Sequence, residues 1–143
     1  MWQRIAQWLA GLWAGVLLGL GAIGAPAGFA VAPVEIAGRS AGRMFAIEAH
    51  LSLAVAVVLL LVIRKAAPAS DAPVAPRVNT HLFLVLATLL CTVIGYFVLQ
   101  PMMAQARAGL GSLSFGALHG LSAGFFALKG LLVLWLAWRL TAR

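Results

Sequence analysis

The sequence predicts an all-α protein, a four-helix bundle embedded in a membrane, and three observations carry this prediction. Of the 143 residues, 64% are hydrophobic and only 9% are charged. The mean hydropathy of +1.05 is far above what a water-soluble domain needs. The hydrophobic residues gather in four runs, each long enough for a helix to cross a hydrocarbon layer about 30 Å thick. We expect residues 1–143 to form a single transmembrane domain.

The first apolar run carries no charged residue from Ile5 to Val34, more than the roughly 20 residues that one span needs. The run must therefore tilt, bend or end early, and Pro26 and Pro33 are the natural places for this. We place the first helix at residues 5–30. It is too long for the apolar region of about 7 to 15 residues in a cleaved signal peptide, so we expect it to be retained.

Three further apolar runs predict helices at residues 44–63, 80–99 and 113–138. The segment AAPASDAPVAP, residues 66–76, is rich in Pro and Ala and falls in a predicted cytoplasmic loop at residues 64–79. The single cysteine, Cys91, lies inside an apolar run, so it forms no internal disulfide and no CxxC motif.

The Lys and Arg residues near the ends of the runs predict the orientation. Six lie on the side of the two termini: Arg4, Arg64, Lys65, Arg77, Arg139 and Arg143. Three lie on the other side: Arg39, Arg43 and Arg107. Because the side richer in Lys and Arg stays in the cytoplasm, both termini are expected there. The net charge of +7 does not indicate a nucleic-acid partner, because no basic patch is interleaved with exposed aromatics.

The stretch AGRMFAIEAH, residues 41–50, places Arg43, Glu48 and His50 at the mouth of the second predicted helix. A charge facing hydrocarbon costs roughly 2.5 to 3.5 kcal/mol at mid-helix, so such residues are usually paired or face the protein interior. Glu48 and His50 are two residues apart, about 200° around a helix, and cannot point the same way. We favour an inward-facing Glu48, because a carboxylate facing lipid costs more than an imidazole, which can remain neutral. Its expected partner is Arg43 or His119.

Lys129 falls near mid-bilayer in the fourth predicted helix and should turn into the bundle. His119, Ser122, Phe126 and Lys129 follow spacings of three, four and three, which places them on one stripe. By helix rise, Glu48 lies roughly 10 Å nearer the outer face, so a direct Glu48–Lys129 pair would be stretched.

Thr88 and Thr92 of the third predicted helix lie at a better depth to accept hydrogen bonds from Lys129. Lys129 is then either a structural residue or one that binds a substrate or relays protons.

These residues define a candidate polar cluster. Its members are Arg43, Glu48, His119, Ser122 and Lys129. The sequence offers no catalytic residue set, because a carboxylate pair, a nucleophile elbow, a phosphate loop and HExxH are all missing, and we lean against an enzyme. We expect no metal and no cofactor. The alternative is haem or metal ligation by His50 and His119, which lie at similar depth on different helices.

Gly11, Gly15 and Gly19 recur at intervals of four in the first predicted helix. They form a smooth stripe that allows another backbone to approach closely. The stripe serves either packing inside the bundle or the face of a homo-oligomer, and the sequence leaves both open.

The fourth predicted helix carries SFGALHGLSAGFFAL, residues 114–128, which resembles the F-x-x-x-H-G-x-S motif of transmembrane protein 205 and related small bacterial four-helix proteins. The segments GAPAGFAVAPVEIAGRSAGRMF (residues 24–45) and QPMMAQAR (residues 100–107) resemble its Gly-Phe and Pro-Met elements. The family positions are Phe29, Pro101, Phe115, His119, Gly120 and Ser122. The resemblance implies a multi-pass protein of a bacterial inner membrane and, from animal members, a link to platinum-drug resistance.

Three functions remain in the order in which we favour them. The first is an accessory or structural membrane component, surrounded by the lipid bilayer and associated with its own copies or with a membrane complex. The second is a small transporter or permease component that uses Glu48, His119 and Lys129 as a polar path. The third is a haem- or metal-binding redox protein.

Overall fold

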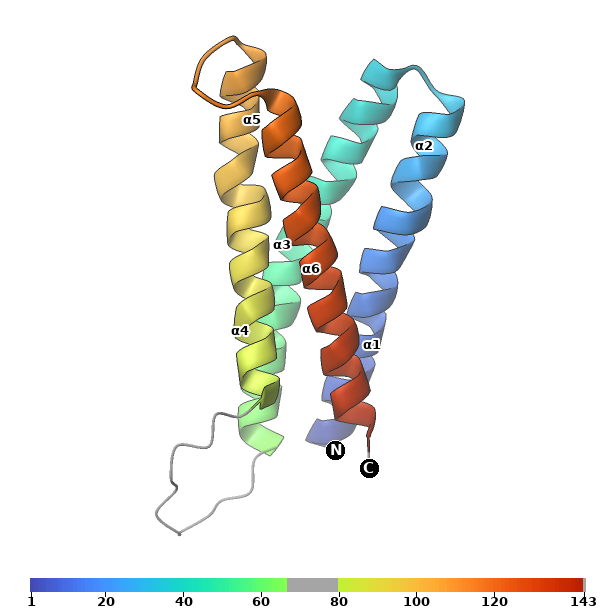
Figure 1. The fold of residues 1–143 in the computed structure, drawn as a ribbon. Helices are drawn as coiled ribbons and strands as arrows, with labels where there is room; N and C mark the ends of the chain where they lie inside the picture. Colours follow the sequence, from blue (N-terminus) through green and yellow to red (C-terminus); the bar gives the residue numbers. More distant parts are fainter. Residues whose placement is uncertain (67–79, 143) are drawn as a thin grey trace.

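In the computed structural model, which describes residues 1–66 and 80–142, four long helical segments form a bundle (Figure 1). They are Trp2–Val31, Val34–Ala66, Thr80–Arg107 and Phe115–Thr141, and each is long and apolar enough to cross a membrane. The described residues contain no strand. The prediction of an all-helical protein with four candidate membrane spans is therefore confirmed.

Two of the four segments contain a wide π-helical turn. The first segment consists of α1 (Trp2–Leu18), the turn η1 (Gly19–Gly24) and α2 (Ala25–Val31). The third consists of α4 (Thr80–Thr92), the turn η2 (Val93–Val98) and α5 (Leu99–Arg107). The remaining two segments are the single helices α3 (Val34–Ala66) and α6 (Phe115–Thr141).

Each wide turn ends shortly before a proline, which is Pro26 in α2 and Pro101 in α5. Proline has no N–H, and its ring clashes with the carbonyl four residues earlier. Those carbonyls belong to Ala22 and Phe97, which lie inside η1 and η2. The widened turn makes room for the ring, so the helix continues past the proline instead of ending.

Two helices are longer than the sequence predicted. α3 begins at Val34, not at residue 44, and it therefore includes Arg39 and Arg43, which we had expected before the helix. The carbonyl of Pro33 accepts the N–H groups of Ile36 and Ala37 at 2.9 Å each, so the chain enters the helix directly after the proline. The third segment continues to Arg107 instead of stopping at residue 99, because η2 accommodates Pro101.

α6 begins close to its expected start. Its N-cap is Ser114, whose Oγ accepts the backbone N–H of Ala117 at 3.2 Å. Of the predicted loop at residues 64–79, residues 64–66 belong to α3 and residues 67–79 lie outside the described part of the chain.

The helices surround a core in the half of the bundle that holds both termini (Figure 1). α1 and α4 each pack against both α3 and α6, so α3 and α6 face one another across the diagonal. The buried side chains of this half include Trp13, Leu59, Leu84, Val133 and Leu136. Toward the other end, α2 packs on α3 and α5 packs on α6, and Figure 1 shows these two pairs leaning apart.

Candidate functional site

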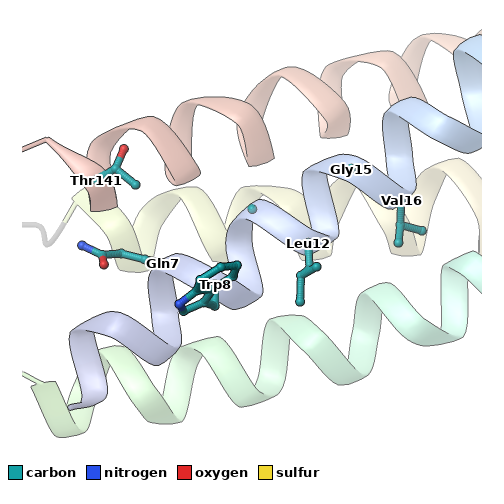
Figure 2. Close-up of a pocket in the computed structure, with 7 residues that line it drawn as sticks. Gln7, Trp8, Leu12, Gly15, Val16 and Thr141 are labelled. Carbon is teal, nitrogen blue, oxygen red and sulfur yellow. The ribbon is translucent and has the colours of Figure 1, made fainter.

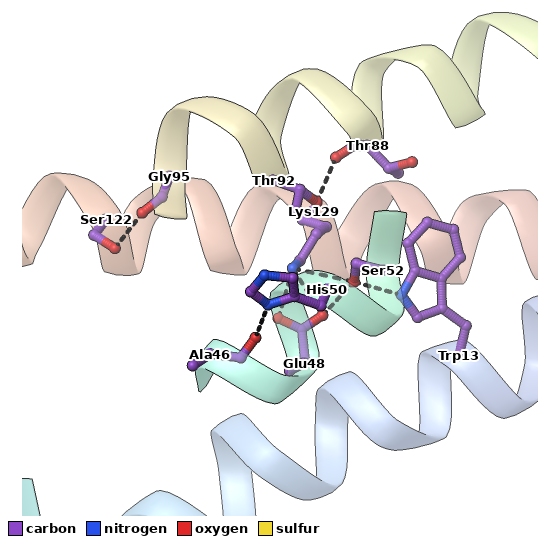
Figure 3. Close-up of polar contacts among 10 residues, drawn as sticks. All are labelled: Trp13, Ala46, Glu48, His50, Ser52, Thr88, Thr92, Gly95, Ser122 and Lys129. Atoms are coloured by element: carbon purple, nitrogen blue, oxygen red, sulfur yellow. Dashed lines mark hydrogen bonds and ion pairs between the residues drawn. The ribbon is translucent and has the colours of Figure 1, made fainter. Parts of the chain in front are cut away.

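A buried ion pair crosses the diagonal of the bundle (Figure 3). Lys129 Nζ on α6 donates to both carboxylate oxygens of Glu48 on α3, at 2.8 Å each. The two side chains are only 4% and 3% exposed, and no other salt bridge occurs among the described residues. The estimate from helix rise suggested that a direct Glu48–Lys129 pair would be stretched. The pair forms at 2.8 Å, because the long Lys129 side chain bridges the difference in depth.

Two neutral side chains complete the contacts of the ion pair. Ser52, one turn after Glu48, donates its hydroxyl to Glu48 Oε1. Trp13 Nε1 on α1 donates to Ser52 Oγ at 2.9 Å, and Lys129 Nζ lies 3.4 Å from the same oxygen. The network therefore connects α1, α3 and α6. Sequence reasoning missed Trp13, because indole rings are typically expected at the headgroup level and this one is buried in the core.

The ion pair lies near the middle of the spans. Glu48 is close to the midpoint of Val34–Ala66, and Lys129 is close to the midpoint of Phe115–Thr141. Both side chains are buried inside the bundle, so neither charged group has access to solvent. Each charge is therefore stabilised mainly by its partner, since an unpaired charge at this depth is costly.

An aromatic side chain covers the ion pair on the side away from the termini. The Phe126 ring lies 5.1 Å from Lys129 Nζ and meets Phe45 of α3 edge to face, with centroids 5.0 Å apart. It also fills the space beside Gly21 in η1, where an added Cβ would lie 2.7 Å from Phe126 Cε1. Phe126 thus extends from α3 to the first wide turn and separates the charges from the diverging half.

The second wide turn is held by the neighbouring positions of α6. Ser122 Oγ donates to the carbonyl of Gly95 in η2 at 2.6 Å. A Cβ at Gly95 would lie 2.7 Å from Phe125 Cβ, so this backbone approaches α6 closely. Ser122, a predicted cluster member, is half-buried and supports η2 instead of contacting the ion pair.

The other two members of the predicted cluster lie elsewhere. Arg43 is exposed on α3, and no ion pair forms with it in the described part of the chain. His119 is exposed and stacks on Phe115 of its own helix, with centroids 5.7 Å apart. The expectation that Glu48 pairs with Arg43 or His119 is wrong, because Lys129 satisfies both carboxylate oxygens.

Two threonines expected to accept hydrogen bonds from Lys129 bond within their own helix. The Thr88 hydroxyl donates to the carbonyl of Val85 at 2.7 Å, and the Thr92 hydroxyl donates to the carbonyl of Thr88 at 2.9 Å. Such bonds to the preceding turn are common for threonine in helices. This expectation is therefore wrong.

The two histidines proposed as ligands have separate surroundings. The His50 ring is exposed and meets Phe97 of η2 edge to face at 5.2 Å, whereas His119 stacks on Phe115 of α6. In the described residues, no group of three or more His, Cys, Asp or Glu side chains is placed to hold a metal ion.

The glycine stripe lies on the surface of the bundle. An added Cβ at Gly11, Gly15 or Gly19 would meet nothing within 4 Å, so the bundle does not use the stripe for its own packing. A groove of about 700 Å³ runs along this face of α1 (Figure 2). Its lining is Gln7, Trp8, Gly11, Leu12, Gly15, Val16 and Thr141.

Comparison with known proteins gives a family and no closer relative. No curated protein and no solved structure matches the chain. A family model described as a domain of unknown function, DUF4149, matches residues 8–112, which include Trp13, Glu48 and Ser52 but not Lys129. This match covers most of the chain. The chain therefore belongs to the DUF4149 family.

Proposed function

We propose that the protein is a structural or accessory component of a bacterial inner membrane, held in register by its central ion pair. The observation that carries this proposal is that every N–H donor of the Lys129 ammonium group has an oxygen partner. Its ammonium group has three N–H donors, and three oxygens lie around it: both oxygens of Glu48 and the hydroxyl of Ser52. No donor is left for a substrate, so the network serves to align three helices.

The orientation is part of the same proposal. Arg4 lies in the first turn of α1, Arg64 and Lys65 lie in the last turn of α3, and Arg139 lies in the last turn of α6. Figure 1 shows these helix ends at the end of the bundle that holds both termini. This basic end supports a cytoplasmic location for the termini. The relationship to transmembrane protein 205 also remains a proposal, supported by the motif in α6.

The test reconstitutes the wild-type protein and the double variant Glu48→Met/Lys129→Met in proteoliposomes. A structural pair predicts that the double variant folds and inserts like wild type, because two linear apolar side chains of similar size replace it. It also predicts the same ion permeability for both proteins and for empty vesicles, measured with a pH-sensitive dye and a potential-sensitive dye. A flux present only with wild type would contradict the structural role.

A second candidate function is a small transporter, and one observation favours it. The α2–α3 and α5–α6 pairs lean apart (Figure 1), and Phe126, whose ring lies 5.1 Å from Lys129 Nζ, also lies beside Gly21 in the wide turn that leads into α2. Rearrangement of the two pairs would expose Glu48 and Lys129 to one side of the membrane. The flux measurement decides between the two functions.

Self-association through Gly11, Gly15 and Gly19 also belongs to the proposal. No other part of the bundle lies within 4 Å of a Cβ added at these glycines, so the stripe leaves room for the close approach of a helix from a second copy. Haem or metal ligation by His50 and His119 ranks below both functions, because no contact brings the two imidazoles together.

A further inference from the structure

The groove of about 700 Å³ on α1 is hollow because two of its lining residues lack side chains. A Cβ added at Gly11 or Gly15 would meet nothing within 4 Å, and the exposed side chains of Trp8, Leu12 and Val16 also line the groove (Figure 2). α1 belongs to a candidate membrane span, so a membrane brings lipid chains or other helices to this surface. The groove therefore offers an apolar hollow to a chain from outside the bundle.

The polar residues of the groove lie at one end of it. Gln7 and Thr141 lie at the end that holds the termini, and Figure 2 shows the apolar side chains following along α1. Gln7 Nε2 donates to the carbonyl of Leu140 at 2.7 Å, which connects this end of α1 to α6. By helix rise, the groove extends about 14 Å from Gln7 to Val16. It is polar at one end and apolar over the rest of its length, which matches an amphiphile.

Arg4 continues the line of the glycines toward the N-terminus. It precedes Gly11 by seven residues and Gly15 by eleven, so the three lie within about 40° of one another on one face of α1. The Arg4 side chain is exposed, and within the described residues it forms no salt bridge. A guanidinium group binds a phosphate through two parallel N–H bonds. The polar end of the groove is thus complementary to an anionic headgroup.

The charge of Arg4 favours a lipid over a second copy of the chain as the occupant of the groove. Two copies paired in parallel through Gly11 and Gly15 would place Arg4 against Arg4, and like charges across an interface repel. An anionic lipid places a phosphate at this position instead, and basic residues beside membrane spans attract such headgroups.

We propose that the groove binds an anionic phospholipid, with its phosphate at Arg4 and one acyl chain along Gly11 and Gly15. The lipid and a second copy compete for this face of α1, so anionic lipid opposes self-association. The lipid site itself depends neither on self-association nor on the role of the Glu48–Lys129 pair.

The test titrates the detergent-solubilised chain with dioleoylphosphatidylglycerol, which is anionic, or with dioleoylphosphatidylcholine, which is zwitterionic and has the same acyl chains. Native mass spectrometry counts the lipids bound to the monomer. The wild type should bind the first phosphatidylglycerol more tightly than the first phosphatidylcholine. Arg4→Gln should bind phosphatidylglycerol roughly tenfold more weakly, as expected for the loss of a charged hydrogen bond, and should bind phosphatidylcholine like the wild type.

Arg139→Gln is the matched control. It removes the same charge at the same end of the bundle, but Arg139 lies about 200° around α6 from the groove residue Thr141. This variant should bind both lipids like the wild type. Gly15→Leu places a side chain in the hollow, so it should bind both lipids more weakly.

Four results would overturn the site. They are equal wild-type affinities for the two lipids, an unchanged affinity in Arg4→Gln, an equal loss in Arg139→Gln, and unchanged affinities in Gly15→Leu. A dimer fraction that rises with phosphatidylglycerol would also contradict the proposal, because it would place the lipid between two copies. Arg4 is exposed in the first turn of α1, so Arg4→Gln should fold and decide the question even if Gly15→Leu does not fold.

Discussion

Breaking the central ion pair on one side only should be the most damaging single change in the protein. In Glu48→Met the Lys129 ammonium loses the two 2.8 Å bonds to the carboxylate and keeps the 3.4 Å contact with Ser52. In Lys129→Met the carboxylate loses both bonds from the ammonium. Because the side chains are 4% and 3% exposed, each single variant should lose about 3–5 kcal/mol of unfolding free energy.

The double variant Glu48→Met/Lys129→Met should be much less affected. It buries no charge, and replacement by linear apolar side chains of similar volume costs less than about 1.5 kcal/mol. The sum of the two single losses should therefore exceed the loss in the double variant by at least about 4.5 kcal/mol. This difference measures the coupling of the two residues.

The assay follows unfolding in mixed micelles titrated with sodium dodecyl sulfate. Trp13 is the natural probe, because it is buried and donates to Ser52 beside the ion pair. The four exposed tryptophans are replaced by phenylalanine in all proteins compared: Trp2, Trp8, Trp135 and Trp138. Single losses below about 1 kcal/mol, or additive losses in the double variant, would refute a buried structural pair.

Three further predictions concern the wide turn and the glycine stripe. Gly95→Ala should lower the unfolding free energy by about 1–3 kcal/mol, because its Cβ would lie 2.7 Å from Phe125 Cβ; Gly28→Ala, where the Cβ meets nothing within 4 Å, is the control and should not destabilise in the same titration. Ser122→Ala should lower the unfolding free energy by about 1 kcal/mol, because it removes the hydroxyl that donates to the Gly95 carbonyl. Equal unfolding free energies for Ser122→Ala and for the hydroxyl-bearing variant Ser122→Thr would contradict this. Gly15→Leu should shift the protein toward monomer in lipid, measured by energy transfer between labelled copies, and an unchanged signal would remove the stripe as an interface.

The number and type of the helices could be predicted because each span is recorded directly in the hydropathy of the chain. The ends of the helices could not. Hydropathy marks where a helix enters hydrocarbon, but backbone hydrogen bonding determines where a helix begins and ends. α3 therefore begins at Val34, before the apolar run. The third predicted helix likewise ended at residue 99 with its apolar run, whereas the helical segment continues through η2 and past Pro101 to Arg107.

The site was predictable in part, for a comparable reason. The cost of a charge in lipid indicates that Glu48 and Lys129 turn inward, and the structure places both in the interior. Their direct contact was underrated because counting helix rise ignores the reach of the lysine side chain and the tilt of the helices. Trp13 carried no sequence signal of its role, since its hydrogen bond to Ser52 depends on the packing of α1 against α3.

The central claim is that Glu48 and Lys129 are in direct contact within the membrane, and solid-state NMR in lipid bilayers tests it most directly. The sequence has two lysines and two glutamates, so Lys65→Arg and Glu35→Gln leave one residue of each type. The measurement is the dipolar coupling between ¹⁵Nζ of Lys129 and ¹³Cδ of Glu48. We predict strong dephasing that corresponds to an ammonium on both carboxylate oxygens at 2.8 Å. Dephasing no greater than that of a sample carrying Glu48→Gln would contradict the account.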